Sequence, residues 1–313
     1  MTSSAIAVSG LRKAFGDKTV LDGIDLEVPA GSVFSLLGPN GAGKTTTVNV
    51  LTTLMKADAG TARVAGHDVA TEAKAVRAAI GVTGQFAAVD ELLTGQENLQ
   101  LMVDLNRSNS NIADLLERFD LTEAAQKSVS TYSGGMRRKL DLAMTLVGHP
   151  RIIFLDEPTT GLDPRSRRTM WSIIRDLVAG GVTIFLTTQY LDEADQLADR
   201  IAVLDQGRLV AEGTPDDLKR RMPGTHVRLR FTTAGELDAA ARVLADATRD
   251  DATRDDEALT LRVPSDGGTK SVRALLDRLD EYSISAEEFS VHTPDLDDVF
   301  LALTGHTTEV VAK

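Results

Sequence analysis

The sequence predicts an α/β fold with a largely parallel sheet, followed by a smaller α+β domain. Apolar, strand-like runs alternate with helical segments through the first two thirds of the chain, which is the pattern of parallel sheets. A glycine-rich loop at 38–46 joins one such strand to a helix. The pattern breaks near Met222-Pro223-Gly224, and residues 225–313 carry 18 Asp/Glu against 10 Lys/Arg. We therefore expect one domain over 1–222 and a small acidic accessory domain over 225–313.

Composition narrows the class of protein. The 313 residues are 42% hydrophobic, which suits a folded core, and no run approaches the ~20 apolar residues of a membrane-spanning helix. The absence of cysteine excludes disulfides, thiolate zinc sites and cysteine nucleophiles, and it fits a reducing cytosol. The first residues lack the basic and apolar regions of a signal peptide, so none is expected. A net charge of −12 argues against general binding to nucleic-acid phosphates.

Strands and helices alternate along the first domain. Short runs of strand formers between turn residues mark the strands, and longer segments with few strand formers mark the helices. The expected strands are two runs within 5–30 around a turn at 15–18, then 33–37, a hairpin piece at 63–69, 80–83, 151–155, 182–187, and a hairpin of 201–204 with 208–212. The expected helices are 46–51, a helical subdomain at about 91–148, 165–179 and 192–198.

The acidic tail has the pattern of a β-α-β-α-β unit that ends in one more helix. The pentapeptide Ala-Thr-Arg-Asp-Asp occurs twice in succession at 247–256, which predicts a solvated loop between a helix at about 235–246 and a strand at about 257–263. An apolar stripe on the last helix consists of Leu296, Val299, Phe300 and Leu303. Such a stripe usually covers its own domain's core, and docking on a second subunit or on the first domain is the alternative.

The loop at 38–46 has the form G-x-x-x-x-G-K-[ST] between a strand and a helix, which is the setting of a phosphate-binding loop. Its glycines let backbone N–H groups point inward, and the helix N-terminus adds partial positive charge. Lys44 can reach the β- and γ-phosphates, and the Thr45 hydroxyl can bind Mg²⁺. The expected binding residues are Gly38, Pro39, Asn40, Gly41, Ala42, Gly43, Lys44, Thr45 and Thr46. The chain is therefore expected to bind a nucleoside triphosphate.

A second apolar run ends in two carboxylates, Asp156 and Glu157, which is the Walker B pattern. A strand buried on both faces would deliver Asp156 to the Mg²⁺ shell, usually through a water molecule. Glu157 would then orient and polarise the attacking water. A strand end that is merely acidic is common, but its combination with the phosphate-binding loop disfavours that interpretation.

Ser133-Gly134-Gly135 opens a further helix, and small residues at a helix N-terminus form a second potential anion site. One chain has no second phosphate to offer this site, whereas a second nucleotide-bearing chain does. Here the sequence resembles the ATP-binding subunits of ABC transporters, whose signature is Leu-Ser-Gly-Gly-Gln. Tyr132 and Met136 depart from the flanks of that signature. The resemblance implies that Ser133 and Gly135 contact the γ-phosphate of an ATP held by the partner subunit.

The resemblance spans roughly residues 5–222 and rests on six motifs in a fixed order. It implies that Gln85 belongs to the Q-loop, which binds Mg²⁺ and links it to the transmembrane partner. It implies that Asp163 lies in the D-loop, which communicates across the dimer. It also implies that Phe15 stacks on adenine, with a core aromatic on a strand as the alternative.

Gln189 occupies the position of the family's switch histidine. A glutamine amide can donate a hydrogen bond to a γ-phosphate oxygen, but it cannot become cationic near neutral pH as histidine can. Glutamine here, together with Val82-Thr83-Gly84-Gln85 and the acidic tail, resembles the ATPases of daunorubicin-type antibiotic exporters. We expect ATP hydrolysis to persist and to depend on Gln189.

These inferences predict an ATP-hydrolysing, energy-coupling subunit of a bacterial ABC exporter for a drug or antibiotic. Two copies would sandwich two ATP molecules with Mg²⁺, and each site would combine Lys44 and Glu157 of one chain with Ser133 and Gly135 of the other. A separate permease would dock on the helical segment after Gln85 and hold the ATPase at the cytoplasmic side of the plasma membrane, without contact to cargo or nucleic acid. A soluble ABC ATPase acting on nucleic acid or ribosomes, and an ATP-gated regulator without turnover, are the alternatives.

Overall fold

The computed structural model describes residues 4–84, 87–220, 224–248, 252–266, 268–292 and 294–304. The expectation for Gln85 falls outside these described residues. The chain divides into two compact units, Met1–Pro215 and Asp216–Lys313. This division lies a few residues before the break that the sequence indicates near 222–224.

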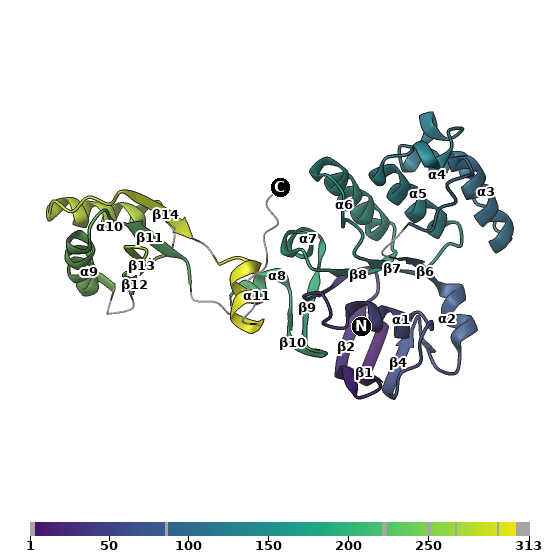
Figure 1. The fold of residues 1–313 in the computed structure, drawn as a ribbon, viewed down its shortest axis with the longest axis horizontal. Coiled ribbons are helices and arrows are strands. Elements are labelled where there is room, and N and C mark those ends of the chain that lie inside the picture. The colour runs from purple at the N-terminus through teal and green to yellow at the C-terminus, as the bar shows by residue number, and fades with distance from the viewer. Residues whose placement is uncertain are drawn as a thin grey trace. The chain divides into compact units, whose positions relative to one another are not determined.

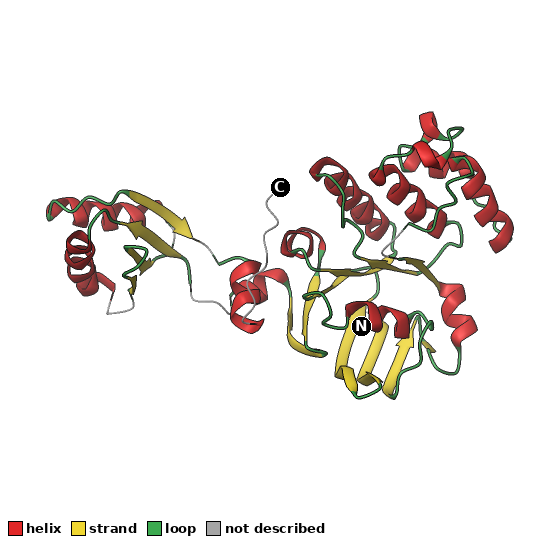
Figure 2. Cartoon of the chain, in the orientation of Figure 1, coloured by secondary structure: helices red, strands yellow, loops and turns green. Residues whose placement is uncertain are grey.

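Two sheets form the first unit (Figures 1 and 2). The central sheet has the strand order β10-β9-β3-β8-β7-β6, and only β10 runs antiparallel to its neighbour. Its strands are β3 (Val33–Leu37), β6 (Ile80–Thr83), β7 (Ile152–Asp156), β8 (Thr183–Thr188), β9 (Arg200–Asp205) and β10 (Arg208–Gly213). The antiparallel sheet, of order β2-β1-β4-β5, consists of β1 (Ser4–Phe15), β2 (Lys18–Pro29), β4 (Ala59–Val64) and β5 (His67–Asp68). The predicted α/β class is confirmed.

The helices of this unit begin and end within a few residues of the expected ranges. They are α1 (Lys44–Leu51), α3 (Gly95–Asn106), α4 (Ile112–Arg118), α5 (Gly134–Leu146), α6 (Pro164–Ala179) and α7 (Leu191–Leu197). Short 3₁₀ turns at Thr122–Ala124 and Val129–Thr131 precede α5. Two helices were not anticipated, α2 (Ala73–Ala79) and, at the junction of the two units, the short α8 (Pro215–Lys219). No helix in the described ranges is both long and apolar enough to cross a membrane.

The central sheet is buried on both faces, and each face has its own apolar cluster. Along β3, Phe34 and Leu36 face the cluster that contains α1 and the antiparallel sheet, whereas Val33 faces the cluster that contains α3 to α6. Figure 1 shows the same layers, with α1 on one side of the sheet and α5 and α6 on the other. Burial on both sides explains why these strands are continuous apolar runs in the sequence. Because these strands run parallel, their carboxyl ends, where ligands bind in such sheets, lie at one edge.

The second unit is a β-α-β-β-α-β fold followed by one helix. Its elements are β11 (His226–Arg230), α9 (Ala234–Thr248), β12 (Thr253–Asp255), β13 (Thr260–Pro264), α10 (Thr269–Glu281), β14 (Glu288–His292) and α11 (Leu296–Thr304). The strand order β12-β13-β11-β14, with antiparallel neighbours throughout, is that of ferredoxin-like domains.

The tandem pentapeptide is only partly the loop that the sequence predicted. Its second copy contains β12, which pairs with β13, and Arg254 within it forms ion pairs with Asp238 and Asp256. Backbone pairing to a neighbouring strand satisfies the N–H and C=O groups of these polar residues, so no apolar alternation is needed. In the first copy, Ala247 and Thr248 end α9, and residues 249–251 are outside the described ranges.

The apolar stripe of α11 is buried at Leu296, Val299 and Phe300. These residues are nevertheless not part of the second unit's apolar cluster, which consists of Val227, Leu229, Phe231, Leu237, Ala240, Leu244, Leu261, Val263, Leu279 and Ile284. Within the described residues, the stripe thus contributes no side chain to that core. Docking of α11 elsewhere stays a prediction.

Candidate ATP-binding and hydrolysis site

The loop after β3 has a backbone that requires glycine. A Cβ atom on Gly38 would lie 2.3 Å from the carbonyl oxygen of Leu204. Gly41 and Gly43 have φ angles of +82° and +113°, in the left-handed region that favours glycine. The Gly38 N–H donates to the carbonyl of Thr188 at 3.2 Å, which attaches the loop to the end of β8. The sequence pattern and the local geometry therefore agree on a tight, backbone-lined loop.

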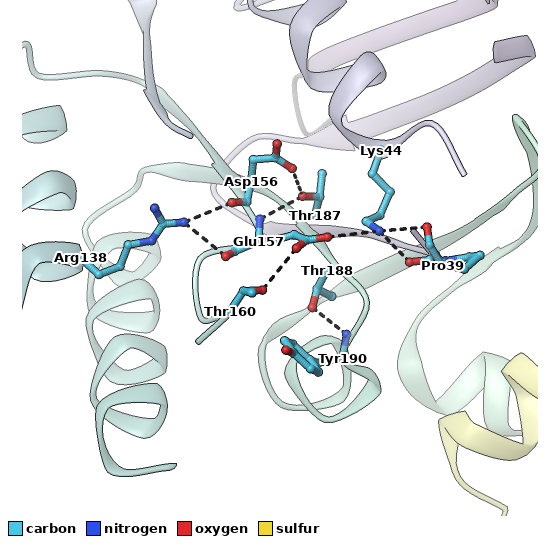
Figure 3. Close-up of polar contacts among 10 residues, drawn as sticks. Pro39, Lys44, Arg138, Asp156, Glu157, Thr160, Thr187, Thr188 and Tyr190 are labelled. Atoms are coloured by element: carbon cyan, nitrogen blue, oxygen red, sulfur yellow. Dashed lines mark hydrogen bonds and ion pairs between the residues drawn. The ribbon is translucent and has the colours of Figure 1, made fainter. Parts of the chain in front are cut away.

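Lys44 places a buried cation inside this loop. Its ammonium donates to the carbonyl oxygens of Gly38 at 2.8 Å and Pro39 at 3.1 Å, and it lies 3.4 Å from Oε1 of Glu157 (Figure 3). Burial lowers the pKa of Lys44, and the charge of Glu157 opposes that shift. The buried ammonium thus contacts two carbonyl oxygens and one carboxylate. A bound phosphate group would supply further negative charge to balance its positive charge.

Most of the other loop residues are accessible to solvent. Asn40, Gly41 and Thr45 are exposed, Thr46 is half-buried, and Ala42 is buried beneath the loop. Thr45 lies in the first turn of α1, where a hydroxyl can bind a cation that accompanies a phosphate. These placements agree with the predicted roles and do not test them.

The carboxylates at the end of β7, Asp156 and Glu157, are held by β8. Asp156 pairs with Thr187 in the sheet register, and the Thr187 hydroxyl donates to Oδ1 of Asp156. The Glu157 N–H contacts both the carbonyl and the hydroxyl oxygen of Thr187 at 3.1 Å, and the Thr160 hydroxyl donates to Oε2 of Glu157 at 3.3 Å. Glu157 has φ = +49°, an uncommon conformation for a residue other than glycine. Such backbone strain clusters at functional sites, because the surroundings must hold it in place.

Gln189 directly follows β8 and is half-buried. Its neighbours are fixed, because the Tyr190 N–H donates to the Thr188 hydroxyl at 2.9 Å and the Tyr190 ring lies 4.9 Å from the guanidinium of Arg167. The parallel strands β3, β7 and β8 thus lead the phosphate-binding loop, the two carboxylates and Gln189 to the same edge of the sheet.

The Ser133-Gly134-Gly135 motif opens α5 towards solvent. Ser133 caps the helix by accepting a hydrogen bond from the Met136 N–H at 3.2 Å. Ser133 and Gly134 are exposed, and Gly135 is half-buried with a Cβ position only 2.7 Å from the Ser166 hydroxyl. Because α5 and α1 cover opposite faces of the central sheet, the motif and the phosphate-binding loop belong to different layers of the chain (Figure 1).

Asp163 and Phe15 are the two remaining predicted site residues, and Asp163 makes more contacts within the chain than Phe15 does. Asp163 caps α6, accepting from the N–H groups of Arg165 and Ser166 and from the Ser166 hydroxyl. The hydrogen bond from that hydroxyl is the main cause that lowers the pKa of Asp163. Phe15, at the end of β1, is 50% exposed with the Lys13 ammonium 5.6 Å from its ring. The alternative of a core aromatic is therefore wrong for Phe15.

We examined the described residues for side chains that could bind a metal ion together. Within the described part of the chain, no group of three or more His, Cys, Asp or Glu residues could hold a metal ion. Mg²⁺ sites of nucleotide-binding proteins instead use one or two protein oxygens together with substrate phosphates. The exposed Thr45 hydroxyl and the Asp156 carboxylate are oxygen donors of that kind.

Sequence reasoning missed several polar residues around Glu157. Thr160 and Thr187 hold its side chain and its N–H, and Arg138 of α5 donates to the carbonyl oxygens of Asp156 and Glu157 (Figure 3). A signal for Arg138 did exist, because it lies one turn before Asp141 on the buried side of a helix that is otherwise apolar there.

Comparison with known proteins identifies the family. A family model described as ABC transporter matches residues 21–160. The daunorubicin resistance ATP-binding protein DrrA3 of Streptomyces coeruleorubidus is 49% identical over 315 residues, covering 99% of each chain. The Nod factor export ATP-binding protein I of Ralstonia nicotianae is 37% identical over 306 residues, covering 96% of this chain and 94% of that protein. A crystal structure of an ABC transporter's ATP-binding cassette in its ADP conformation matches with a TM-score of 0.63 at 26% identity, covering 69% of this chain and 93% of its own. The chain belongs to the ABC transporter family, as one of its ATP-hydrolysing members.

Proposed function

We propose that this chain is the energy-coupling ATPase subunit of a bacterial exporter for a drug or antibiotic. The relative at 49% identity is named for daunorubicin resistance and covers 99% of this chain, and the relative at 37% identity is named for export. ATP-binding subunits of ABC exporters work with a separate transmembrane component. The proposed location is accordingly the cytoplasmic face of the plasma membrane, where the permease holds the subunit.

Within one site, the residues divide the work of ATP hydrolysis. Bound Mg²⁺–ATP supplies the phosphoryl group that water attacks. Lys44 neutralises charge on the β- and γ-phosphates, while Thr45 and Asp156 would hold the metal ion, which would neutralise further phosphate charge. Glu157 orients the water and accepts its proton at a side-chain oxygen. Gln189 donates a hydrogen bond to a γ-phosphate oxygen.

The observation that carries the two-chain arrangement is the open N-terminus of α5. Ser133 and Gly134 are exposed, and they belong to the layer opposite the one that contains α1. A helix N-terminus with small residues attracts anions. A second copy of the chain brings a γ-phosphate to this position, so that two ATP molecules lie between two subunits.

The proposed docking surface for the permease lies in the helical subdomain. Among its described residues, the large apolar side chains that are exposed are Leu92 at 91%, Leu101 at 43% and Leu105 at 70% exposure. Leu101 and Leu105 are four residues apart on α3 and therefore lie on one side of the helix. Two exposed leucines on one side of a helix offer an apolar contact to another protein.

An ATP-dependent dimer is the direct test of the two-chain site. Glu157→Gln keeps the shape of the side chain and removes its basicity, so that ATP binds without turnover. We expect this variant to elute as a dimer with Mg²⁺–ATP and as a monomer with ADP. The control Lys44→Ala/Glu157→Gln should stay monomeric in both nucleotides. A Glu157→Gln chain that binds ATP yet stays monomeric contradicts the proposal.

Export can be tested in a drug-susceptible host. Co-expression of the chain with its transmembrane permease should lower the accumulation of daunorubicin, and Lys44→Ala should abolish that effect. The chain should be retained in membranes only when the permease is present. Equal accumulation with parental chain and Lys44→Ala contradicts drug export, whatever the outcome of the dimerisation test.

A further inference from the structure

Arg138 connects the signature helix to the catalytic edge of the sheet. The residue lies in the second turn of α5 and is buried. Its guanidinium donates from Nε to the Pro158 carbonyl at 3.0 Å and from Nη1 to the Gly84 carbonyl at 2.6 Å. From Nη2 it donates to the carbonyl oxygens of Asp156 at 3.1 Å and Glu157 at 3.3 Å (Figure 3). One side chain therefore joins α5 to the ends of both β6 and β7.

Asp141 extends this connection by one turn. Its Oδ1 accepts from the Ala88 N–H at 3.0 Å, and its Oδ2 lies 3.6 Å from Nη1 of Arg138. The Arg138 and Asp141 side chains are 8% and 5% exposed. In the sequence, Gly84 and Ala88 stand on either side of Gln85. Arg138 therefore binds the backbone just before Gln85, and Asp141 binds the backbone three residues after it. Arg138 also binds the backbone at the end of β7.

A purely structural role explains this pair poorly. Moving two charges out of water costs several kcal/mol, and well-packed apolar residues commonly fill such a place with no loss of stability. Burial indeed raises the pKa of Asp141 and lowers that of Arg138. A planar guanidinium, however, can donate along several fixed directions at once, which neither an apolar side chain nor lysine can do. We therefore infer that the pair serves to fix the positions of these carbonyl groups.

We propose that Arg138 and Asp141 are positioning residues that couple the signature helix to the catalytic carboxylate. Glu157 has a left-handed backbone, and its carbonyl is one of the groups that Arg138 holds. A shift of α5 on contact with the partner's ATP is transmitted through Arg138 to the backbone of Glu157. The inference rests on the proposed two-chain site, because only there does α5 meet a nucleotide.

Arg138→Lys tests the coupling while keeping the charge. Lysine presents one compact ammonium and cannot reach the carbonyls of both segments. Because the phosphate-binding loop is untouched, we expect the Kd of a fluorescent ATP analogue to stay within about twofold and kcat to fall about tenfold or more. The matched control is Arg137→Lys on the same helix. Arg137 contacts Glu91 and the carbonyls of Val129 and Ser130, outside the catalytic edge, and its substitution should leave kcat unchanged.

Two further variants separate positioning from folding. Asp141→Asn keeps an acceptor for the Ala88 N–H and leaves Arg138 unpaired, so both stability and kcat should fall. Arg138→Met/Asp141→Leu removes both charges, so its Tm should recover above that of Asp141→Asn while kcat stays low. Recovery of kcat together with Tm in the double variant, or parental kcat in Arg138→Lys, overturns the inference.

The dimerisation assay distinguishes failure of this inference from failure of the proposed function. A Glu157→Gln chain that does not dimerise with ATP contradicts the two-chain site itself. If Glu157→Gln dimerises, Glu157→Gln/Arg138→Lys should need more ATP to do so, because α5 is no longer held in place. An unchanged ATP requirement contradicts the coupling and leaves the proposed function standing.

Discussion

At the scale of single residues, Glu157 combines catalytic chemistry with an unusual backbone. Its N–H is held by Thr187, its side chain by Thr160 and Lys44, and its φ angle is +49°. Glu157→Gln should lower kcat by about 10²-fold or more, because an amide cannot accept the proton of the attacking water. ATP affinity should be preserved. Steady-state phosphate release measures kcat, and parental turnover in this variant contradicts the assigned role.

Gln189 stands where the resemblance to ABC transporter ATPases places a switch histidine. Its amide is expected to contact the γ-phosphate, so Gln189→Ala should reduce ATP hydrolysis with little change in protein stability. Since glutamine does not titrate, hydrolysis should also lack the pH dependence that a switch histidine near pH 6.5 would impart. Gln189→His serves as the comparison and should introduce that dependence. ATP hydrolysis by Gln189→Ala at the parental rate contradicts the role of the amide.

At the scale of elements, Glu193 connects α7 to Thr159 and to Trp171 of α6. The side chain is fully buried, and Oε1 accepts from the Thr159 hydroxyl at 2.8 Å and from Nε1 of Trp171 at 3.2 Å. Burial raises the pKa of Glu193 above its ordinary value of 4.5. The folded state therefore holds this proton to higher pH than the unfolded state does, and its contribution to stability is lost as pH rises above 4.5.

Glu193→Gln should remove that pH dependence. Glutamine keeps an oxygen that can accept both hydrogen bonds and stays neutral at every pH. The Tm of the variant relative to the parent should increase from pH 4 towards pH 8, which thermal unfolding monitored by circular dichroism measures. Parallel Tm profiles for the two proteins across that range would show that the buried carboxyl does not titrate as its environment implies.

Elements with a strong local pattern were predictable, and elements that depend on distant partners were not. Strands β3, β7 and β8 are buried on both faces, so their apolar runs are visible without knowledge of neighbours. By contrast, β12 is a polar segment that becomes a strand only because β13 pairs with it. The phosphate-binding loop and the carboxylates were readable from spacing. For Arg138, the sequence showed only a charged residue on the buried side of a helix, and its acceptors could not be predicted because they come from two other segments of the chain.

At the scale of the full chain, we expect the second unit to act in dimerisation or permease binding and not in ATP binding. The chain separates into Met1–Pro215 and Asp216–Lys313, and the site residues all lie in the first of these units. Truncation after Gly224 should therefore leave ATP affinity unchanged. Because α11 buries an apolar stripe outside its own domain's cluster, the truncation should weaken dimerisation or permease binding. Size-exclusion chromatography and membrane retention measure these effects, and full retention of both contradicts a docking role for the tail.

The arrangement of one ATP site across two chains is tested most directly by mixing two inactive variants. Lys44→Ala disables the phosphate-binding loop, and Gly135→Asp places a negative charge where the partner's γ-phosphate should lie. A mixed dimer contains one composite site with an intact loop from one chain and an intact signature from the other. We expect each variant alone to be inactive and ATP hydrolysis to reappear on mixing, in proportion to the amount of mixed dimer. If each variant is inactive alone and the mixture is inactive as well, although mixed dimers form, the site does not span two chains.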